Sequence, residues 1–396
     1  MPSRLSLLSL PALLLAAAAW ATVPAAPQLD APAYILIDAL TGKSLAEKAV
    51  DEPRRPASLA KMMTAYLAFE AIAAGRRQLD EPVRVSRRAS EAGGYKMGFT
   101  AGEQVELELL LLAMIHRSGN DAAEAIAELL GGSSDQFVAT MNRKAAQLGM
   151  EDTVFGNPSG RDEPGVVSTS TARDLARLAA RTIADFPQLY RLYGIDDFEF
   201  GRARLPSRNR LLASLAGADG LKTGHTSAAG HCLAASMMRR DREGMRLIAV
   251  VLGAASADAR DAAAGELFAY GYRNWQSVLL LAEPQPTLGQ IRVWGGQADQ
   301  VALRPDTSLP VKLLLPRDQA EQLSAQLELP EWLEAPLSAG DAAGRLIISA
   351  GAHTVLEIPA VASEAVAAGP WWKRASDYVR LHWVSPPQRT VAGVGK

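Results

Sequence analysis

Ser58 and Lys61 lie three residues apart at the start of the long apolar run "ASLAKMMTAYLAFEAI". Residues spaced i and i+3 in a helix share one face, with Cβ atoms about 5–6 Å apart, so the lysine amine can reach the serine hydroxyl. Burial lowers the pKa of a lysine, and a neutral amine can accept the serine proton. The pair therefore predicts a serine nucleophile with a lysine base. The alternative is a helix-capping serine beside a lysine at the surface.

Two further short motifs follow along the chain. The triplet Ser118–Asn120 (SGN) precedes an apolar helical run that begins at Asp121, and the triplet Lys222–Gly224 (KTG) lies on a predicted strand. Each triplet alone is compatible with ordinary structure, a capping turn and a strand end. In this order with SxxK, they resemble the three motifs of the serine penicillin-recognising enzymes.

The segments around these motifs extend the resemblance. The stretches "RRPASLAKMMTAYLAFE", "HRSGNDAAEAIAE" and "DGLKTGHTSAAGHCLAAS" closely resemble the low-molecular-mass penicillin-binding proteins, the D-alanyl-D-alanine carboxypeptidases. The connecting stretches "GNPSGRDEPG", "STARDLA" and "SRNRLL" resemble the same family, and the resemblance runs from Tyr34 to Trp383. It implies a serine carboxypeptidase that removes the terminal D-alanine from peptidoglycan stem pentapeptides and is acylated by penicillins.

The resemblance also implies a role for each motif residue. Ser58 would be the acylated nucleophile and Lys61 its general base. Ser118 would relay protons, and Asn120 would orient Lys61 and the substrate amide. These four residues would form and break the acyl bond.

The KTG segment would bind the substrate. Lys222 would supply positive charge near the SGN serine, and Thr223 would hold the terminal carboxylate of the substrate. The backbone N–H of His225, which follows Gly224, would form the oxyanion hole together with that of the nucleophile; such donors contribute about 3–4 kcal/mol. Arg208, in "SRNRLL", is a second candidate for the carboxylate, with an exposed loop position as its alternative.

The chain departs from the family pattern in two places. Tyr95 stands where the family often has a small residue, and Gly98 where an aromatic residue is common. The loop Glu163–Ser170 is longer than usual and lacks a histidine often found there. Because both places flank the expected cleft, they concern substrate preference and hydrolysis rate rather than acylation.

Two other functions share these motifs. A class A β-lactamase needs a deacylating glutamate between the second and third motifs, and Glu163 is the nearest acid there. A scaffold that binds penicillin without turnover would need none of the six motif residues. The leading hypothesis therefore remains the carboxypeptidase.

The order of elements predicts an α+β domain. A hairpin is predicted over Tyr34–Lys48, and three consecutive strands over "GLKTG", "HCLAASMM" and "RLIAVVLG". Helices are predicted from Ser58, from Asp121, over "TARDLARLAARTI" and over Asp258–Tyr272. This order is typical of helices packed on an antiparallel sheet. The resemblance implies the same fold, a transpeptidase/β-lactamase-like catalytic domain, expected at 22–276.

Short strands separated by Gly, Pro and Asp follow: "QIRVWGG", "VALRP", "VKLLLP", "RLIISAG" and "HTVLEIP". They predict a small all-β, sandwich-like domain at 277–365. The last segment, 366–396, contains a predicted amphipathic helix with the stripe Trp371, Trp372, Ala375, Tyr378, Val379, His382 and Trp383. A basic helix with an aromatic face is typical of a peripheral membrane anchor; packing of its tryptophans on their own domain is the alternative.

Composition excludes several classes of function. The chain has 396 residues, of which 48% are hydrophobic and 21% charged, as in a soluble globular protein of two domains. A net charge of −2 gives no indication of nucleic-acid binding. The single cysteine, Cys232, excludes an internal disulfide and is predicted to be a buried small residue. The five histidines (116, 225, 231, 353 and 382) lack metal-ligand spacing, so no metal or other cofactor is expected.

Residues 1–21 have the layout of a cleaved signal peptide. Arg4 precedes an apolar core from Leu5 to Ala18, and the triplet Ala19–Ala21 has small residues at both ends. The core is short for a membrane span, and an uncleaved N-terminal anchor is the alternative. We therefore expect a periplasmic enzyme of a Gram-negative bacterium, attached peripherally to the inner membrane by its C-terminal helix.

Overall fold

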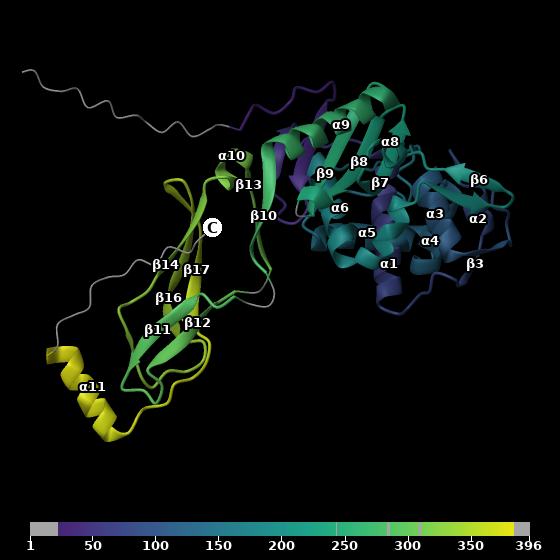
Figure 1. The fold of residues 1–396 in the computed structure, drawn as a ribbon. Helices are drawn as coiled ribbons and strands as arrows, with labels where there is room; N and C mark the ends of the chain where they lie inside the picture. Colours follow the sequence, from purple (N-terminus) through teal and green to yellow (C-terminus); the bar gives the residue numbers. More distant parts are fainter. Residues whose placement is uncertain (1–22, 243, 283–285, 308–309, 384–396) are drawn as a thin grey trace, which may run out of the picture.

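The computed structural model describes residues 23–242, 244–282, 286–307 and 310–383 (Figure 1). The predicted signal peptide, 1–21, and the last residues, 384–396, lie outside the described residues. The described residues form a mixed α+β domain, a β-rich domain and a final helix, as the sequence predicts. None of the helices in these ranges is both long enough and apolar enough to span a bilayer.

A five-stranded antiparallel sheet, in the order β2-β1-β9-β8-β7, forms the centre of the first domain. Its strands are β1 (Ala33–Asp38), β2 (Ser44–Lys48), β7 (Ala218–Thr226), β8 (Gly230–Arg239) and β9 (Met245–Ala254). The predicted hairpin is β1–β2, and the three predicted strands are β7, β8 and β9. Side chains of β1 alternate between two cores: Ile35 and Ile37 face one, Tyr34 and Leu36 the other.

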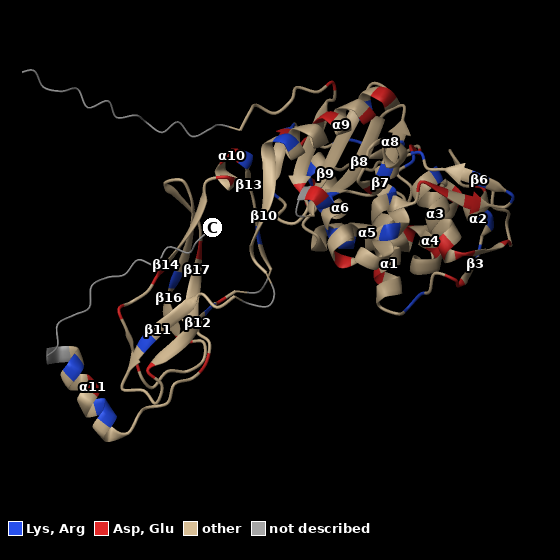
Figure 2. Cartoon of the chain, viewed as in Figure 1, with Lys and Arg blue, Asp and Glu red and all other residues tan. Residues whose placement is uncertain are grey.

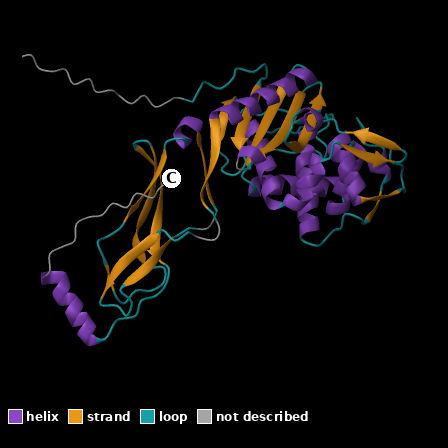
Figure 3. Cartoon of the chain, viewed as in Figure 1, coloured by secondary structure: helices purple, strands orange, loops and turns teal. Residues whose placement is uncertain are grey.

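Helices cover both faces of this sheet (Figure 3). One core contains residues of α9 (Ala257–Asn274), which is N-capped by the hydroxyl of Ser256. The other contains residues of the larger helical cluster: α1 (Lys61–Ala73), α3 (Leu107–Arg117), α4 (Asn120–Gly131), α5 (Ser134–Gln147) and α6 (Ala172–Asp185). The predicted helices from Asp121, over "TARDLARLAARTI" and near Asp258 thus correspond to α4, α6 and α9.

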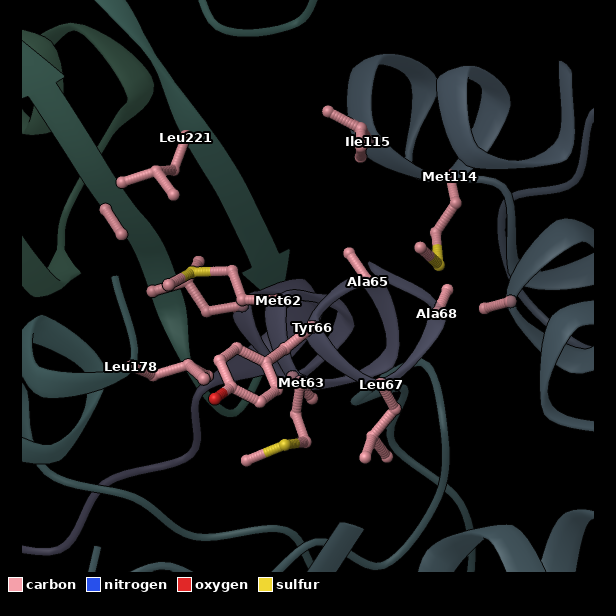
Figure 4. Packing of buried hydrophobic residues seen from close by; sticks show 14 of the residues in the cluster. Met62, Met63, Ala65, Tyr66, Leu67, Ala68, Met114, Ile115, Leu178 and Leu221 are labelled. Atoms are coloured by element: carbon pink, nitrogen blue, oxygen red, sulfur yellow. The ribbon is translucent and has the colours of Figure 1, made fainter. Parts of the chain in front are cut away.

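Helix α1 lies inside the helical cluster and is apolar on nearly every side, as a central core helix must be. Figure 4 shows its side chains among those of α3, α6 and β7; the labelled residues are Met62, Met63, Ala65, Tyr66, Leu67, Ala68, Met114, Ile115, Leu178 and Leu221. The α-helix begins at Lys61, three residues later than predicted, because Ala57–Ala60 forms a 3₁₀ turn (η1). Ser58 therefore lies in this turn.

The remaining elements of the first domain are short. Strands β3 (Pro82–Arg84) and β4 (Gln104–Glu106) form one ribbon, and β5 (Asp197–Phe200) and β6 (Ala203–Pro206) form another. The short helices are α2 (Arg87–Ser90), α7 (Pro187–Tyr190) and α8 (Leu211–Ser214), with the 3₁₀ turns η2 (Arg191–Gly194) and η3 (Arg240–Arg242). In the chain, β3, α2 and β4 lie between α1 and α3, whereas α7, η2, β5, β6 and α8 lie between α6 and β7.

The second domain is built on a six-stranded sheet, in the order β14-β16-β17-β12-β11-β15, and a separate ribbon, β10–β13. The bounds are β10 (Trp275–Leu281), β11 (Gly289–Trp294), β12 (Gln300–Pro305), β13 (Val311–Pro316), α10 (Arg317–Ala320), β14 (Leu323–Glu328), β15 (Leu333–Glu334), β16 (Ala342–Ala350) and β17 (His353–Ala362). Leu281 of the ribbon packs with Leu346 and Ile348 of the sheet. The strand predicted from "VKLLLP" is β13, which pairs with β10 instead of joining the larger sheet.

Helix α11 (Trp371–Trp383) contacts the second domain through polar side chains. The carboxylate of Asp377 accepts a hydrogen bond from the backbone N–H of Gly295, and only 7% of Asp377 is exposed. In contrast, Trp371 is 79% exposed and Trp372 61%. These two tryptophans therefore do not pack on their own domain, and basic residues lie along the same helix (Figure 2). The side chain of Trp383 lies outside the described part of the chain.

Candidate active site

The predicted site residues meet at a cleft of about 1020 Å³ in the first domain. Its lining includes Ser58, Ser118, Asn120, Arg208, Thr223, Gly224 and His225. Lys61 and Lys222 lie beneath this lining, each only 1% exposed. The structure therefore brings together residues that are more than a hundred positions apart in the sequence.

Three neighbours surround the amine of Lys61. Its Nζ lies 3.0 Å from Ser58 Oγ, 2.7 Å from Asn120 Oδ1 and 2.8 Å from the carbonyl oxygen of Ser159. The Asn120 amide is oriented, because its Nδ2 donates to the carbonyl of Gly93 at 2.6 Å. Oδ1 of Asn120 and the Ser159 carbonyl can only accept hydrogen bonds. A neutral Lys61 amine therefore donates its two N–H groups to these oxygens, and its lone pair faces the Ser58 hydroxyl.

The electrostatics of the cleft favour that neutral amine. Burial holds the pKa of Lys61 well below its usual value, and the positive charges of Lys222, Arg161 and Arg208 lower it further. Burial also lowers the pKa of Lys222 to about 7, with smaller contributions from Arg208 and Arg260. The site thus contains one buried lysine whose neutral form is favoured and a second whose charge changes near neutral pH.

Close backbone approaches hold Ser58 in place. Ala57 has a φ of 48°, a left-handed conformation that is rare for a residue with a Cβ atom. Gly160 packs against the Ala57 carbonyl so closely that a Cβ atom there would collide with it. A Cβ atom on Gly224 would lie 3.0 Å from the backbone nitrogen of Ser58. Glycine at these two positions therefore lets the 158–160 loop and β7 approach the serine from either side.

The SGN triplet forms the junction between α3 and α4. Ser118 ends α3 with a φ of 67°, and Asn120 begins α4. The next residue, Asp121, is fully buried, and its carboxylate accepts hydrogen bonds from the backbone N–H groups of Met97 and Gly98. Asp121 thereby fixes the loop that forms one wall of the cleft.

The KTG segment lies on the edge strand β7. The Lys222 amine donates to the carbonyl of Thr223 at 2.9 Å. Across the cleft, the Arg208 guanidinium stacks on the ring of Tyr95, with its Cζ 3.7 Å from the ring centroid. The imidazole of His225 stacks on that of His231 with the ring centroids 4.2 Å apart. Arg208 thus lines the cleft from an exposed loop position, where the Tyr95 ring covers its guanidinium.

Sequence reasoning missed several residues of the site. The Ser159 carbonyl has no side-chain signature, although the stretch "GNPSGRDEPG" around it stood out. Arg161, within the same stretch, also lines the cleft, and Arg260 lines it without any motif of its own. In the described part of the chain, His, Cys, Asp and Glu side chains form no group of three or more that could hold a metal ion.

Comparison with known proteins agrees with this geometry. Residues 20–256 match the family model of the D-alanyl-D-alanine carboxypeptidases, peptidase S11. Residues 275–368 match the model of the C-terminal domain of penicillin-binding protein 5. Together the two models cover most of the chain.

Individual relatives match over nearly the full length. The D-alanyl-D-alanine carboxypeptidase DacC of Escherichia coli is 37% identical over 364 residues, which are 90% of this chain and 89% of DacC. The structure of penicillin-binding protein 5 from Haemophilus influenzae superimposes with a TM-score of 0.73 at 32% identity, covering 86% of this chain and 98% of that one.

A third match is a ligand complex. The ampicillin-bound form of penicillin-binding protein D2 from Listeria monocytogenes has a TM-score of 0.57 at 32% identity and covers 62% of this chain and 98% of that one. The cleft, the three motifs and these matches lead to one conclusion. The chain belongs to the peptidase S11 family of low-molecular-mass penicillin-binding proteins and is a serine-type D-alanyl-D-alanine carboxypeptidase of peptidoglycan metabolism with a penicillin-binding protein 5 C-terminal domain.

Proposed function

We propose that Ser58 and Lys61 are the nucleophile and the general base of this carboxypeptidase. The observation that carries the proposal is the hydrogen bonding of Lys61: two acceptor-only oxygens take its N–H groups, and the lone pair faces Ser58. The Ser58 proton moves to Lys61 Nζ as Oγ attacks the carbonyl carbon of the penultimate D-alanine. Ser118, which lines the same cleft, relays a proton to the amine of the leaving D-alanine. The peptide C–N bond breaks, and an ester on Ser58 remains.

The rest of the cleft binds and polarises the substrate. Backbone N–H groups of Ser58 and His225 stabilise the oxyanion, a contribution of about 3 kcal/mol for each such donor. Lys222 adds positive charge, and Thr223 holds the terminal carboxylate of the substrate with Arg208. In the described part of the chain, the other arginines of the cleft have carboxylate partners and Arg208 has none. Its charge is therefore available to the substrate.

A water molecule then hydrolyses the acyl-Ser58 ester. Penicillins acylate the same serine and form an ester that persists; the ampicillin-bound form of a relative supports penicillin binding. Glu163, the one residue that a class A β-lactamase reading would use, is held by Arg161 at 2.8 Å. This ion pair disfavours Glu163 as a deacylating base. Labelled penicillin provides a test: trapping for hours supports the carboxypeptidase, whereas rapid turnover supports the β-lactamase.

Release of D-alanine from a peptide that ends in D-Ala-D-Ala tests the nucleophile. The Ser58→Ala variant is expected to release none, because it retains the pocket but lacks the attacking oxygen. Ser90→Ala, on the short helix α2, is the matched control and retains full activity. Normal release by Ser58→Ala would disprove the mechanism, whatever the behaviour of the other variants.

We also propose domain limits and a location for the mature chain. The catalytic domain spans 22–276, the sandwich-like domain 277–365, and the anchor helix and tail 366–396, after removal of a signal peptide at 1–21. The family models, at 20–256 and 275–368, support this division. The enzyme works in the periplasm of a Gram-negative bacterium.

Helix α11 attaches the enzyme peripherally to the inner membrane. The exposed Trp371, Trp372 and Tyr378 support this role, and Trp383 belongs to the same predicted stripe. Replacing Trp371 and Trp372 together by alanine should weaken binding to phosphatidylglycerol vesicles about tenfold. Leu40→Ala, at another exposed apolar residue, is the matched control. Equal binding by the tryptophan variant and the control would contradict the anchor role.

A further inference from the structure

Arg208 differs from the other arginines that line the cleft. Arg161 pairs with Glu163, and Arg210 and Arg260 both pair with Asp261. In the described residues, no carboxylate pairs with Arg208. A cation without an acidic partner keeps its charge for a ligand, but nothing ionic then fixes its position. The contacts that do fix it come from Tyr95 and His116.

Tyr95 holds the guanidinium of Arg208. The Cζ atom of Arg208 lies 3.7 Å from the centroid of the Tyr95 ring, a cation–π arrangement. The main chain of Tyr95 is held by a hydrogen bond from the backbone N–H of Asn120 to the Tyr95 carbonyl at 2.8 Å, and the Tyr95 hydroxyl accepts a hydrogen bond from Arg117 Nη2 at 3.4 Å. The ring therefore covers one face of the guanidinium and leaves its N–H edge for hydrogen bonds.

His116 contacts the segment that carries Arg208 at two points, the main chain of Arg208 and the side chain of Ser207. The Arg208 N–H donates to the His116 carbonyl at 3.0 Å. The imidazole lies 2.7 Å from the Leu192 carbonyl at Nε2 and 3.1 Å from Ser207 Oγ at Nδ1. A carbonyl can only accept, so Nε2 carries the proton. In the neutral ring Nδ1 must then accept from the Ser207 hydroxyl.

The ring of His116 is neutral near pH 7. Burial lowers the pKa of His116 to about 4, and Lys222 lowers it further, although the hydrogen bond with the Leu192 carbonyl opposes the shift. Ser207 Oγ in turn accepts from the backbone N–H of Asn209 at 3.1 Å. The Asn209 amide donates to the Gly220 carbonyl, two residues before Lys222. His116, Ser207 and Asn209 thus link α3 to β7 through the segment that carries Arg208.

We propose that Tyr95 and His116 are positioning residues that hold Arg208 ready for the terminal carboxylate of the substrate. This inference rests on the carboxylate role proposed above for Arg208. An unrestrained arginine loses rotamer freedom when it binds a ligand, and holding it in the bound geometry beforehand removes part of that loss. Tyr95 fixes the side chain and His116 the main chain. Both residues act through Arg208 and do not touch the reacting atoms.

A double-mutant cycle on purified full-length enzyme tests the role of Tyr95. The measurement is kcat/KM for D-alanine release from a peptide that ends in D-Ala-D-Ala. Tyr95→Leu removes the aromatic face and is expected to lower kcat/KM about threefold, chiefly through KM. Tyr95→Phe, which keeps that face, costs less. Tyr378→Leu, at an exposed tyrosine of α11, is the matched control.

The cycle distinguishes positioning from a general structural effect. Arg208→Ala is expected to lower kcat/KM about tenfold, and adding Tyr95→Leu to it should change nothing further. The same threefold loss in both backgrounds would overturn the inference. A normal kcat/KM for Arg208→Ala would instead reject the carboxylate role of Arg208 in the proposed function. D-alanine release through Ser58 would be unaffected by that result.

The test of His116 uses a rescue. His116→Leu removes both ring hydrogen bonds and is expected to raise KM about fivefold, with a smaller change in kcat. His116→Asn retains an acceptor for the Ser207 hydroxyl and should recover most of the loss. Thermal denaturation of both variants shows whether they fold alike. Equal KM values for folded His116→Leu and wild type would overturn the role of His116.

Discussion

The catalytic cleft and helix α11 arrange charged and aromatic groups in opposite ways. In the cleft, Lys61 and Lys222 are 1% exposed beneath an apolar helical cluster. On α11 the polar side chains of Lys373 and Asp377 contact the second domain, whereas Trp371 is 79% exposed. Buried charge and exposed aromatic surface both cost free energy. In each region this cost falls on residues to which we assign a role, proton transfer in the cleft and surface attachment on α11.

Removing one lysine from each region gives the largest expected contrast. Lys61→Met should lower kcat for D-alanine release about a thousandfold, because no amine then accepts the Ser58 proton. Lys373→Met removes the α11 amine that donates a hydrogen bond to the Gly296 carbonyl. We expect this variant to have the kcat/KM of wild type. Steady-state assays of both purified variants provide the comparison. Substantial turnover by Lys61→Met would mean that another group serves as the base.

Substituting one glycine in each domain by alanine tests how well the backbone of each domain tolerates an added methyl group. Gly160→Ala places a methyl group against the Ala57 carbonyl and should cost about 3 kcal/mol of stability. Because Ala57 precedes Ser58, kcat/KM should also fall. Gly340, in the second domain, has a φ of 92° with open space around its Cα, so Gly340→Ala should cost only about 1 kcal/mol. Calorimetric unfolding measures the stability of both variants. Equal losses of stability would show that the backbone around the cleft adjusts to the added methyl group.

The sequence predicts the pair Ser58 and Lys61 better than it predicts the residues that surround this pair. The three-residue spacing places Lys61 Nζ 3.0 Å from Ser58 Oγ, even though Ser58 lies in a 3₁₀ turn instead of the α-helix. The carbonyl of Ser159 could not be predicted, because every residue carries one. The stack of Arg208 on Tyr95 joins positions 113 residues apart. Contacts of this kind depend on tertiary packing, which short motifs do not encode.

The fold shows the same division. Strands β7, β8 and β9 are apolar runs separated by turns, and local patterning predicts them. The pairing of β13 with β10 is a choice of partner among several similar apolar strands. The stripe on α11 predicts an aromatic face, but only the buried Asp377 shows which side of the helix contacts the domain. Local periodicity thus predicts elements, whereas partners and orientations require the structure.

The buried amine of Lys222 is expected to make the free energy of unfolding depend on pH. Its pKa is about 7 in the folded protein and 10.5 ordinarily, so between these values the unfolded chain binds more protons. Stability therefore rises with pH across this window. Lys222→Met removes the group and should be about 2 kcal/mol more stable than wild type at pH 7, although less active.

The stability advantage of Lys222→Met should shrink as the pH rises and disappear above pH 10.5, where wild-type Lys222 is neutral in both states. Urea denaturation at several pH values measures the difference. Lys312→Met, at a partly exposed lysine of the second domain, is the matched control. A difference that stays constant with pH would show that Lys222 is charged in the folded protein throughout this range.

The smallest expected effect separates a buried contact of α11 from an exposed one. Asp377→Ala leaves the Gly295 N–H without its acceptor and should cost about 1 kcal/mol, seen as faster amide hydrogen exchange along α11. Asp299→Asn removes an ion pair with Lys373 in which Asp299 is 77% exposed, so solvent screening should leave the exchange rates unchanged. Neither variant should alter D-alanine release, since both act far from Ser58 in the sequence and outside the cleft lining. Equal exchange in both variants would mean that Asp377 does not hold the helix, and that its aromatic face is oriented by the remaining contact of Lys373 with Gly296.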